Sequence, residues 1–276
     1  ADLVDSVFGR GKLEDYPGHQ VVELGLVKLY DVTGEKRYLD LAKFFLDVRG
    51  PDGSDYNQAN KKVTDQTEGM GHAVRATYMY TGMADVAAIY NDPSYVYAIR
   101  RIWEDIVYRK TYITGGIGAS GGNEGFQQPY HLPNMSAYCE TCASVGSIMW
   151  NQRMFLYDGE SKYIDILERT LYNALLSGVS LSGDRFFYPN VLESMGQHER
   201  SKWFGCACCP PNVARLLPSL PGYVYATSDQ GIYVNLFMDN KASIDINGEK
   251  VEIIQKTNYP WEGKVEITLN PEKSGK

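Results

Sequence analysis

Hydrophobic spacing predicts a repeated helical hairpin over the first two hundred residues. Three segments share one pattern, in which a turn is followed by Tyr38, Tyr95 or Tyr163 and then by apolar residues at helical spacing. They cover residues 33–47, 91–105 and 158–172. A more uniformly apolar helical stretch precedes each of them. Because a helix without a polar face must be buried, the pattern predicts apolar helices covered by amphipathic ones.

Repeated hairpins of this kind favour two concentric rings of helices. By analogy with other repeat architectures, such a toroid closes with about six hairpins. We therefore expect a mainly α fold in which residues 1–220 form part of an (α/α)6 barrel, its C-terminal part, with earlier hairpins missing from this chain.

The pattern changes to alternation after residue 221. Ile232, Val234, Leu236 and Met238 share one face, which is typical of a strand, and Asn247-Gly248 is a two-residue hairpin signal. Residues 221–276 are therefore predicted to open an antiparallel β-sandwich domain.

Charge and composition narrow the class of partner. The net charge is −7 and the basic residues form no run, which argues against a nucleic-acid partner. No stretch is long and apolar enough to span a membrane, and the start lacks the pattern of a signal peptide, so we expect a cytoplasmic protein. The 21 tyrosines supply flat amphipathic surfaces on which sugars can stack.

All five cysteines fall in two short segments. "CETC" contains Cys139, Glu140 and Cys142, and "CACC" contains Cys206, Cys208 and Cys209. An odd number of cysteines, two of them adjacent, is a poor basis for a disulfide framework. Zinc prefers sulfur ligands and accepts a carboxylate, so the clustering favours a zinc site for which these six residues compete. Spacing alone leaves open whether the metal is structural or catalytic.

Two acids and one histidine stand in unusual places. Glu124 lies in a loop with six glycines, where the backbone can approach a ligand closely and a carboxyl group can act as a general acid. Glu168 occupies an apolar helical stripe, where a carboxylate must meet a cation or a wet cavity. His72 stands at the start of an apolar helix, where a lone histidine is more often a core residue than a catalytic one. His19, His131 and His198 lie near turns and are weaker candidates.

Four motifs in the same order resemble one known family. They are "GHAVRATYMYTGMADVAA", "YITGGIGASGGNEGF", "LPNMSAYCETCASVG" and "CACCPPNVARLLPSLPGYVYA". Together they are similar to the bacterial β-L-arabinofuranosidases of glycoside hydrolase family 127. The resemblance covers nearly the whole chain and implies a helical (α/α)6 barrel followed by β-sandwich domains.

The resemblance also implies roles for individual residues. Cys208 matches the nucleophile that attacks the anomeric carbon, and Glu124 matches the general acid/base. Positions that hold the hydroxyls of the sugar are matched by His72, Glu168 and Tyr188. The zinc ligands are matched by Glu140, Cys142, Cys208 and Cys209. Cys139 and Cys206 then fall outside the metal site.

The resemblance therefore implies a retaining glycosidase that uses Zn²⁺ and releases β-L-arabinofuranose from plant-derived glycans. We expect an arabinofuranoside as the small-molecule partner, a homodimer, and neither nucleic acid nor membrane. A related furanosidase of different sugar specificity is the alternative enzyme. A non-catalytic sugar-binding module with structural zinc is the alternative from another class. A thiol-redox protein is the weakest alternative, because no thioredoxin-like pattern surrounds the cysteines.

Overall fold

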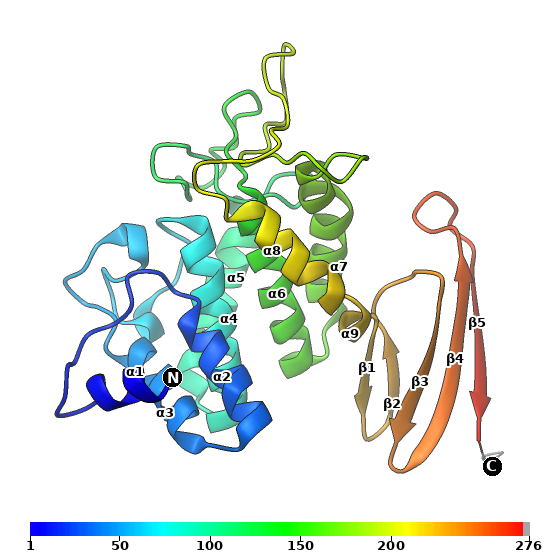
Figure 1. Cartoon of the computed structure of the whole chain (residues 1–276), viewed down its shortest axis with the longest axis horizontal. Coiled ribbons are helices and arrows are strands. Elements are labelled where there is room, and N and C mark those ends of the chain that lie inside the picture. Colours follow the sequence, from blue (N-terminus) through cyan, green and yellow to red (C-terminus); the bar gives the residue numbers. More distant parts are fainter. Residues whose placement is uncertain (273–276) are drawn as a thin grey trace. The chain divides into compact units, whose positions relative to one another are not determined.

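The computed structural model describes residues 1–272, and the chain divides into two compact units, Ala1–Val213 and Ala214–Lys276. The first unit is helical and the second contains the strands (Figure 1). A helix-rich chain with a small antiparallel sheet region is thus confirmed. The predicted closure into an (α/α)6 barrel stays a prediction, and residues 273–276 of the predicted sandwich domain lie outside the described residues.

Three helical hairpins form the body of the first unit. They are α2 (Val22–Thr33) with α3 (Lys36–Asp47), α4 (Ala73–Tyr90) with α5 (Pro93–Arg109), and α6 (Thr141–Asp158) with α7 (Ser161–Arg169). Each pair is joined by two residues, the first of which is left-handed: Gly34, Asn91 or Gly159. Glycine and asparagine tolerate this conformation, which ends a helix and reverses the chain. The predicted hairpins are therefore confirmed.

The hairpins stack so that their first and second helices form two layers. In the first layer, α4 packs against both α2 and α6, and nearly all of α4 and α6 is buried. In the second layer, the Tyr95 hydroxyl of α5 donates to Asp47 of α3, at 2.7 Å, and the Trp103 ring meets Tyr163 of α7 edge to face. Tyr95 and Tyr163, two of the three repeated tyrosines, thus connect one hairpin to the next.

Small residues let the first-layer helices approach closely. A Cβ on Gly146 of α6 would lie 2.1 Å from the Thr77 hydroxyl oxygen of α4. A Cβ on Gly82 of α4 would lie 2.9 Å from that of Glu23 in α2. Close packing of this kind fixes the first-layer helices relative to one another.

The remaining helical elements of the first unit lie in or beside the connections. They are α1 (Asp2–Val7), the 3-10 turns Asp55–Asn57, Val63–Asp65 and Leu176–Gly178, and the π-helical turn Thr170–Leu175. The helix α8 (Cys209–Leu216) begins in the first unit and is followed by the 3-10 turn Leu217–Ser219 and α9 (Pro221–Val224).

The described residues of the second unit form two antiparallel sheets. The first pairs β1 (Tyr225–Ser228) with β2 (Gly231–Val234), and the second has the order β3 (Asn240–Ile246), β4 (Glu249–Thr257), β5 (Val265–Pro271). Asn247 and Gly248 both have positive φ and join β3 to β4 as predicted.

The predicted strand through Leu236 and Met238 is too long, because β2 ends at Val234. The backbone N–H groups of Asn235 and Leu236 donate to the Val224 carbonyl instead of to a partner strand. Leu236 is buried all the same, so the apolar alternation was set by burial rather than by strand pairing.

Candidate functional site

The helices α4, α6 and α8 begin at the same end of the first unit, beneath the long connections. The turns within hairpins have two residues, whereas residues 48–72, 110–140 and 179–208 connect one hairpin or helix to the next. Figure 1 shows the second and third of these connections together above the starts of α6 and α8. A helix start carries partial positive charge from its free N–H groups, which favours anionic side chains there. Most of the predicted site residues gather at this end.

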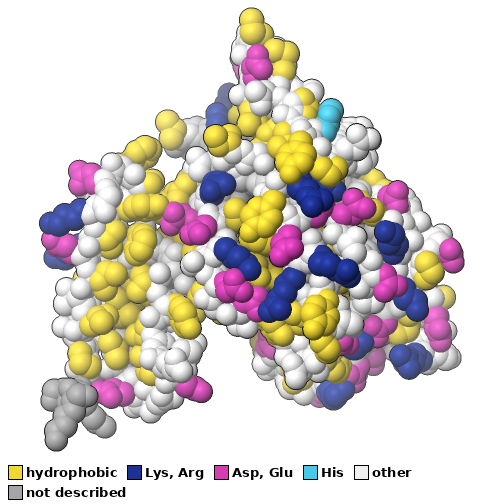
Figure 2. All heavy atoms as spheres, turned by 180° about the vertical axis from the view of Figure 1, so that it is seen from behind, with side chains coloured by type: hydrophobic (Ala, Val, Ile, Leu, Met, Phe, Trp, Pro, Cys, Tyr) yellow, Lys and Arg dark blue, Asp and Glu magenta, His cyan; other side chains and the backbone are white. Residues whose placement is uncertain are grey.

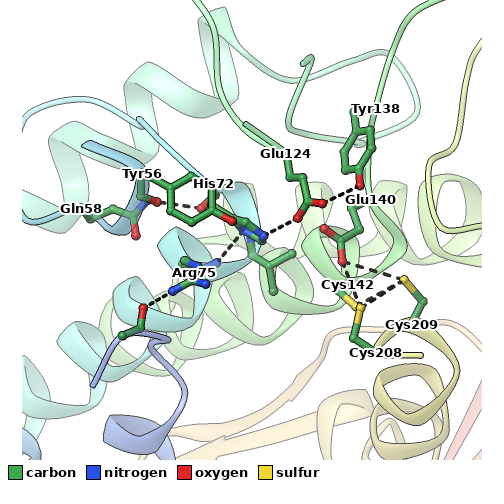
Figure 3. Close-up of polar contacts among 12 residues, drawn as sticks. Tyr56, Gln58, His72, Arg75, Glu124, Tyr138, Glu140, Cys142, Cys208 and Cys209 are labelled. Atoms are coloured by element: carbon green, nitrogen blue, oxygen red, sulfur yellow. Dashed lines mark hydrogen bonds and ion pairs between the residues drawn. The ribbon is translucent and has the colours of Figure 1, made fainter. Parts of the chain in front are cut away.

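Glu140, Cys142, Cys208 and Cys209 form one compact group at two of these helix starts (Figure 3). Their ligand atoms all lie within 4.8 Å of one another. Glu140 and Cys142 belong to the start of α6, and Cys208 and Cys209 to the start of α8. Cys139 and Cys206 are not part of the group, and Cys139 packs in the core with Tyr112, Ala119 and Ala137.

The distances within the group are those of ligands around one metal ion. The sulfur of Cys209 lies 3.4 Å from that of Cys142 and 3.8 Å from that of Cys208. Glu140 Oε1 lies 3.4 Å from the Cys208 sulfur and 3.9 Å from the Cys209 sulfur. For a tetrahedral zinc, ligand distances of about 2.3 Å to sulfur and 2.0 Å to oxygen separate two sulfurs by about 3.8 Å and sulfur from oxygen by about 3.5 Å. The group can therefore hold a tetrahedral metal ion.

Burial separates Cys208 from the other members of the group. Glu140, Cys142 and Cys209 are at most 2% exposed, and Glu140 Oε2 is buried without a hydrogen-bond partner. Cys208 is only partly buried. Among the three sulfurs it is therefore the one that a ligand can reach.

The electrostatics of the group favour a thiolate at Cys208. Hydrogen bonds from Cys142, and then from Cys209, hold the pKa of Cys208 far below its ordinary value. Burial, together with the charge of Cys208, raises the pKa of Glu140 to about 8. Burial also raises the pKa of Tyr188, to which a hydrogen bond with Cys208 contributes. A buried group that concentrates negative charge in this way is suited to a cation.

Asn190 and Thr141 join the segment of Tyr188 to the start of α6, and sequence reasoning missed both. The side-chain amide of Asn190 donates to the Cys139 carbonyl and to the Thr141 hydroxyl, at 2.8 and 3.0 Å. The Thr141 N–H donates to the Tyr188 carbonyl at 3.0 Å. These buried bonds hold Tyr188 beside the start of α6.

Glu124 and His72 meet next to the metal-binding group. His72 Nε2 lies 2.8 Å from Glu124 Oε2, and Glu140 lies within 4.8 Å of both residues. The other ring nitrogen of His72 accepts the N–H groups of Val74 and Arg75 in the first turn of α4. Since this nitrogen is an acceptor, the hydrogen is on Nε2, and His72 donates to the Glu124 carboxylate. Burial lowers the pKa of His72, which favours this neutral form.

Two glycines bring Glu124 to His72. The N–H of Phe126 donates to the Gly71 carbonyl, and the Ala73 N–H donates to the Glu124 carbonyl. A Cβ on Gly125 would lie 1.8 Å from the Gly71 carbonyl oxygen. The loop therefore needs glycine at this position, which explains part of its unusual composition.

His19 also lies at the site, although the sequence made it a weak candidate. Its ring centre is 6.1 Å from that of His72. Burial lowers the pKa of His19, and the charge of Cys208 partly opposes this effect. His19 Nδ1 bonds to the Gln20 carbonyl at 2.8 Å, so Nε2 remains an acceptor. A repeated dipeptide could have pointed to His19, because Gly-His stands just before the first helix of two hairpins, at residues 18–19 and 71–72.

Tyr188 and Glu168 are placed differently. Tyr188 lies beside Cys208, and its ring packs edge to face against Phe204. Glu168 lies on α7, half-buried, and its charge contributes to the raised pKa of Tyr172, for which burial is the larger cause. The metal-binding group and the Glu124 group do not contain it. Its role toward a sugar stays a prediction.

Comparisons with known proteins show that the chain is similar to glycoside hydrolases. The model of the β-L-arabinofuranosidase GH127 catalytic domain matches residues 1–222, and that of the GH127 middle domain matches residues 231–276. The chain belongs to glycoside hydrolase family 127. The resemblance seen in the four motifs is thereby confirmed.

Several relatives are similar over nearly all of the chain. A non-reducing end β-L-arabinofuranosidase of Bifidobacterium longum subsp. longum is 38% identical over 98% of this chain and 46% of its own length. A solved GH127 β-arabinofuranosidase is 55% identical, with a TM-score of 0.95 over 97% of this chain and 43% of its own. A GH127 β-L-arabinofuranosidase of Geobacillus stearothermophilus T6 is 41% identical, with a TM-score of 0.96 over 99% of this chain and 48% of its own. The chain thus spans less than half the length of these relatives.

Proposed function

We propose that the protein is a retaining glycosidase that removes terminal β-L-arabinofuranose from plant-derived glycans. The observation that carries this proposal is the partly exposed Cys208 sulfur, held in a buried acidic group that also adjoins Glu124. The names of the relatives support the sugar, since each of the three is described as an arabinofuranosidase.

We also propose that zinc is the metal held by Glu140, Cys142, Cys208 and Cys209. Three sulfurs and one carboxylate suit zinc, and the distances among them agree with tetrahedral coordination. When bound, zinc keeps a coordinated sulfur in its thiolate form at neutral pH.

The residues of the chain divide the reaction into two displacements. In the first, the Cys208 sulfur bonds to the anomeric carbon as the glycosidic C–O bond breaks, and Glu124 gives its proton to the departing oxygen. In the second, Glu124 takes a proton from water while the water oxygen bonds to the anomeric carbon and the sulfur leaves as thiolate. Two inversions give net retention, as in glycosidases with two carboxylates, but with a sulfur nucleophile.

The surrounding side chains hold the sugar and the acid. His72 donates to Glu124 and so orients it before the sugar binds. The free acceptor of His19 and the hydroxyl of Tyr188 are suited to the sugar hydroxyls near Cys208. Glu168 is proposed to contribute a further contact to the sugar.

Replacement of single cysteines tests the proposal. In the longest natural protein that contains this chain, Cys208→Ser should lower hydrolysis of an aryl β-L-arabinofuranoside by at least about a thousandfold, because the nucleophile is lost. Cys206→Ser is the matched control, since Cys206 is exposed and outside the metal-binding group, and a serine there can still donate to the neighbouring Cys208 sulfur. It should keep most of the activity.

The same assay on a panel of furanosides tests the sugar. Wild-type protein that prefers another furanoside would identify a related furanosidase. Near-normal rates with Cys208→Ser would exclude Cys208 as the nucleophile, and binding of the sugar without any turnover would indicate a binding module.

A further inference from the structure

We propose that Tyr138 positions Glu124 for proton transfer, a role that rests on the proposed glycosidase function. Each carboxyl oxygen of Glu124 has one protein donor (Figure 3). The Tyr138 hydroxyl donates to Oε1 at 3.1 Å, and His72 Nε2 donates to Oε2 at 2.8 Å. Bonds to both oxygens fix the plane of the carboxyl group, which a single donor would leave free to rotate.

Glu124 needs this support because of where it stands. Its backbone is left-handed, with φ of 51°, in the glycine-rich loop, and a third of its side chain is exposed. A glutamate side chain in such a place has considerable rotamer freedom, and ordering it costs free energy in each catalytic cycle unless neighbouring groups hold it.

Tyr138 is itself held firmly. Its carbonyl accepts the Asn190 N–H at 2.8 Å, and its ring centre lies 6.1 Å from that of Tyr188. The Tyr138 ring also lies next to the glycine-rich loop, because a Cβ on Gly121 would be 3.3 Å from it. Tyr138 thus connects the loop of the acid/base to the segment that enters α6.

The two donors to Glu124 differ in what they can do. The neutral ring of His72 carries its hydrogen on Nε2 and can only donate there. A phenol hydroxyl can turn, so Tyr138 can donate to the ionised carboxylate and, once Oε1 is protonated, to the lone pair that Oε1 keeps. The hydrogen on Oε1 then points to the glycosidic oxygen and not to Tyr138. Glu124 gives that proton to the glycosidic oxygen and regains one from water, while Tyr138 keeps its own proton throughout.

A comparison of two leaving groups separates positioning of the acid from a structural role. Bond cleavage needs the acid when the aglycone is an alkyl alcohol, but hardly when it is an activated nitrophenol. With Tyr138→Phe in the zinc-loaded natural protein, kcat/KM should fall about tenfold or more for the alkyl glycoside. For the nitrophenyl glycoside it should change less than about threefold. Loss of one hydroxyl leaves the ring contact with Tyr188 intact.

Tyr112→Phe is the matched control. The Tyr112 hydroxyl donates to the Pro133 carbonyl at 3.0 Å, and its ring packs beside Cys139 rather than Glu124. Both substrates should be hydrolysed at near wild-type rates. Equal losses on the two substrates, or none, with Tyr138→Phe would overturn the positioning role while wild-type turnover upholds the glycosidase. A wild-type protein that hydrolyses neither glycoside would overturn both.

Discussion

At the scale of single residues, Gly125 is a position where the site leaves no room for a side chain. A Cβ there would meet the backbone oxygen of Gly71, which cannot move without displacing His72. Gly125→Ala should therefore lower the free energy of unfolding by about 1–3 kcal/mol and reduce turnover, because Glu124 and His72 move apart. Chemical denaturation and an activity assay measure the two effects.

Gly122 provides the control within the same loop. A Cβ on Gly122 would meet only the Ser120 hydroxyl, at 3.7 Å. Gly122→Ala should change the free energy of unfolding by less than about 0.5 kcal/mol. If the two alanine variants lost the same stability, the close approach of Gly125 to Gly71 would not be what holds the loop.

Residue types predicted part of the site, and contacts supply the rest. Cys142, Cys208 and Cys209 were predictable because cysteines that stand so close together in a sequence are typical of metal sites. Tyr138 and Asn190 carry no such signal, since tyrosine is frequent in this chain and asparagine is common in loops. Their roles depend on partners that the fold brings close, such as Cys139, which lies 51 positions before Asn190. Chain spacing alone does not show such pairs.

At the scale of elements, the end of α5 holds the turn that leads to His72. The Gly69 N–H donates to Asp105 Oδ2 at 3.0 Å, and Lys110 Nζ donates to the Gly69 carbonyl at 2.8 Å. Lys110 and Asp105 also form an ion pair at 2.8 Å, and both are nearly buried. Lys110→Met should lower the free energy of unfolding by about 3 kcal/mol, because it leaves the Asp105 carboxylate buried without its nearest cation. Urea denaturation measures the loss.

Lys36 is the comparison for an exposed pair. It bonds to Asp40 one turn further along α3, and both side chains are largely in solvent. Lys36→Met should have little effect on unfolding, because exposed pairs contribute little. A similar loss for both lysine variants would contradict the role of the buried pair.

The helices were predictable because their periodicity is strong and their turns are explicit. Each hairpin turn contains Gly or Asn followed by an acid, at residues 34–35, 91–92 and 159–160. The end of β2 was not predictable, because Leu236 is buried without belonging to a strand and so continues the alternation. Helical spacing also placed Glu168 on an apolar stripe without showing which groups it faces.

At the scale of the whole molecule, the metal-binding group arises from the order of short turns and long connections. Cys142 and Cys209 are 67 positions apart, yet their sulfurs lie 3.4 Å apart because α6 and α8 begin at the same end of the first unit. The sequence indicated that the two cysteine segments belong together by composition alone. The charges on the face shown in Figure 2 are intermixed, with Lys and Arg beside Asp and Glu. No described helix is long and apolar enough to cross a membrane.

In the proposed reaction, the Cys208 sulfur bonds to the anomeric carbon of the sugar. The most direct measurement is peptide mass spectrometry of the Glu124→Gln protein after reaction with an activated β-L-arabinofuranoside. The activated aglycone leaves without an acid, but glutamine cannot activate water, so the sugar–sulfur intermediate should accumulate. We predict a mass gain of one arabinosyl group on the peptide that contains Cys208, with fragmentation assigning it to that residue. A label on any other residue, or no label while the wild-type protein turns the substrate over, would contradict the account.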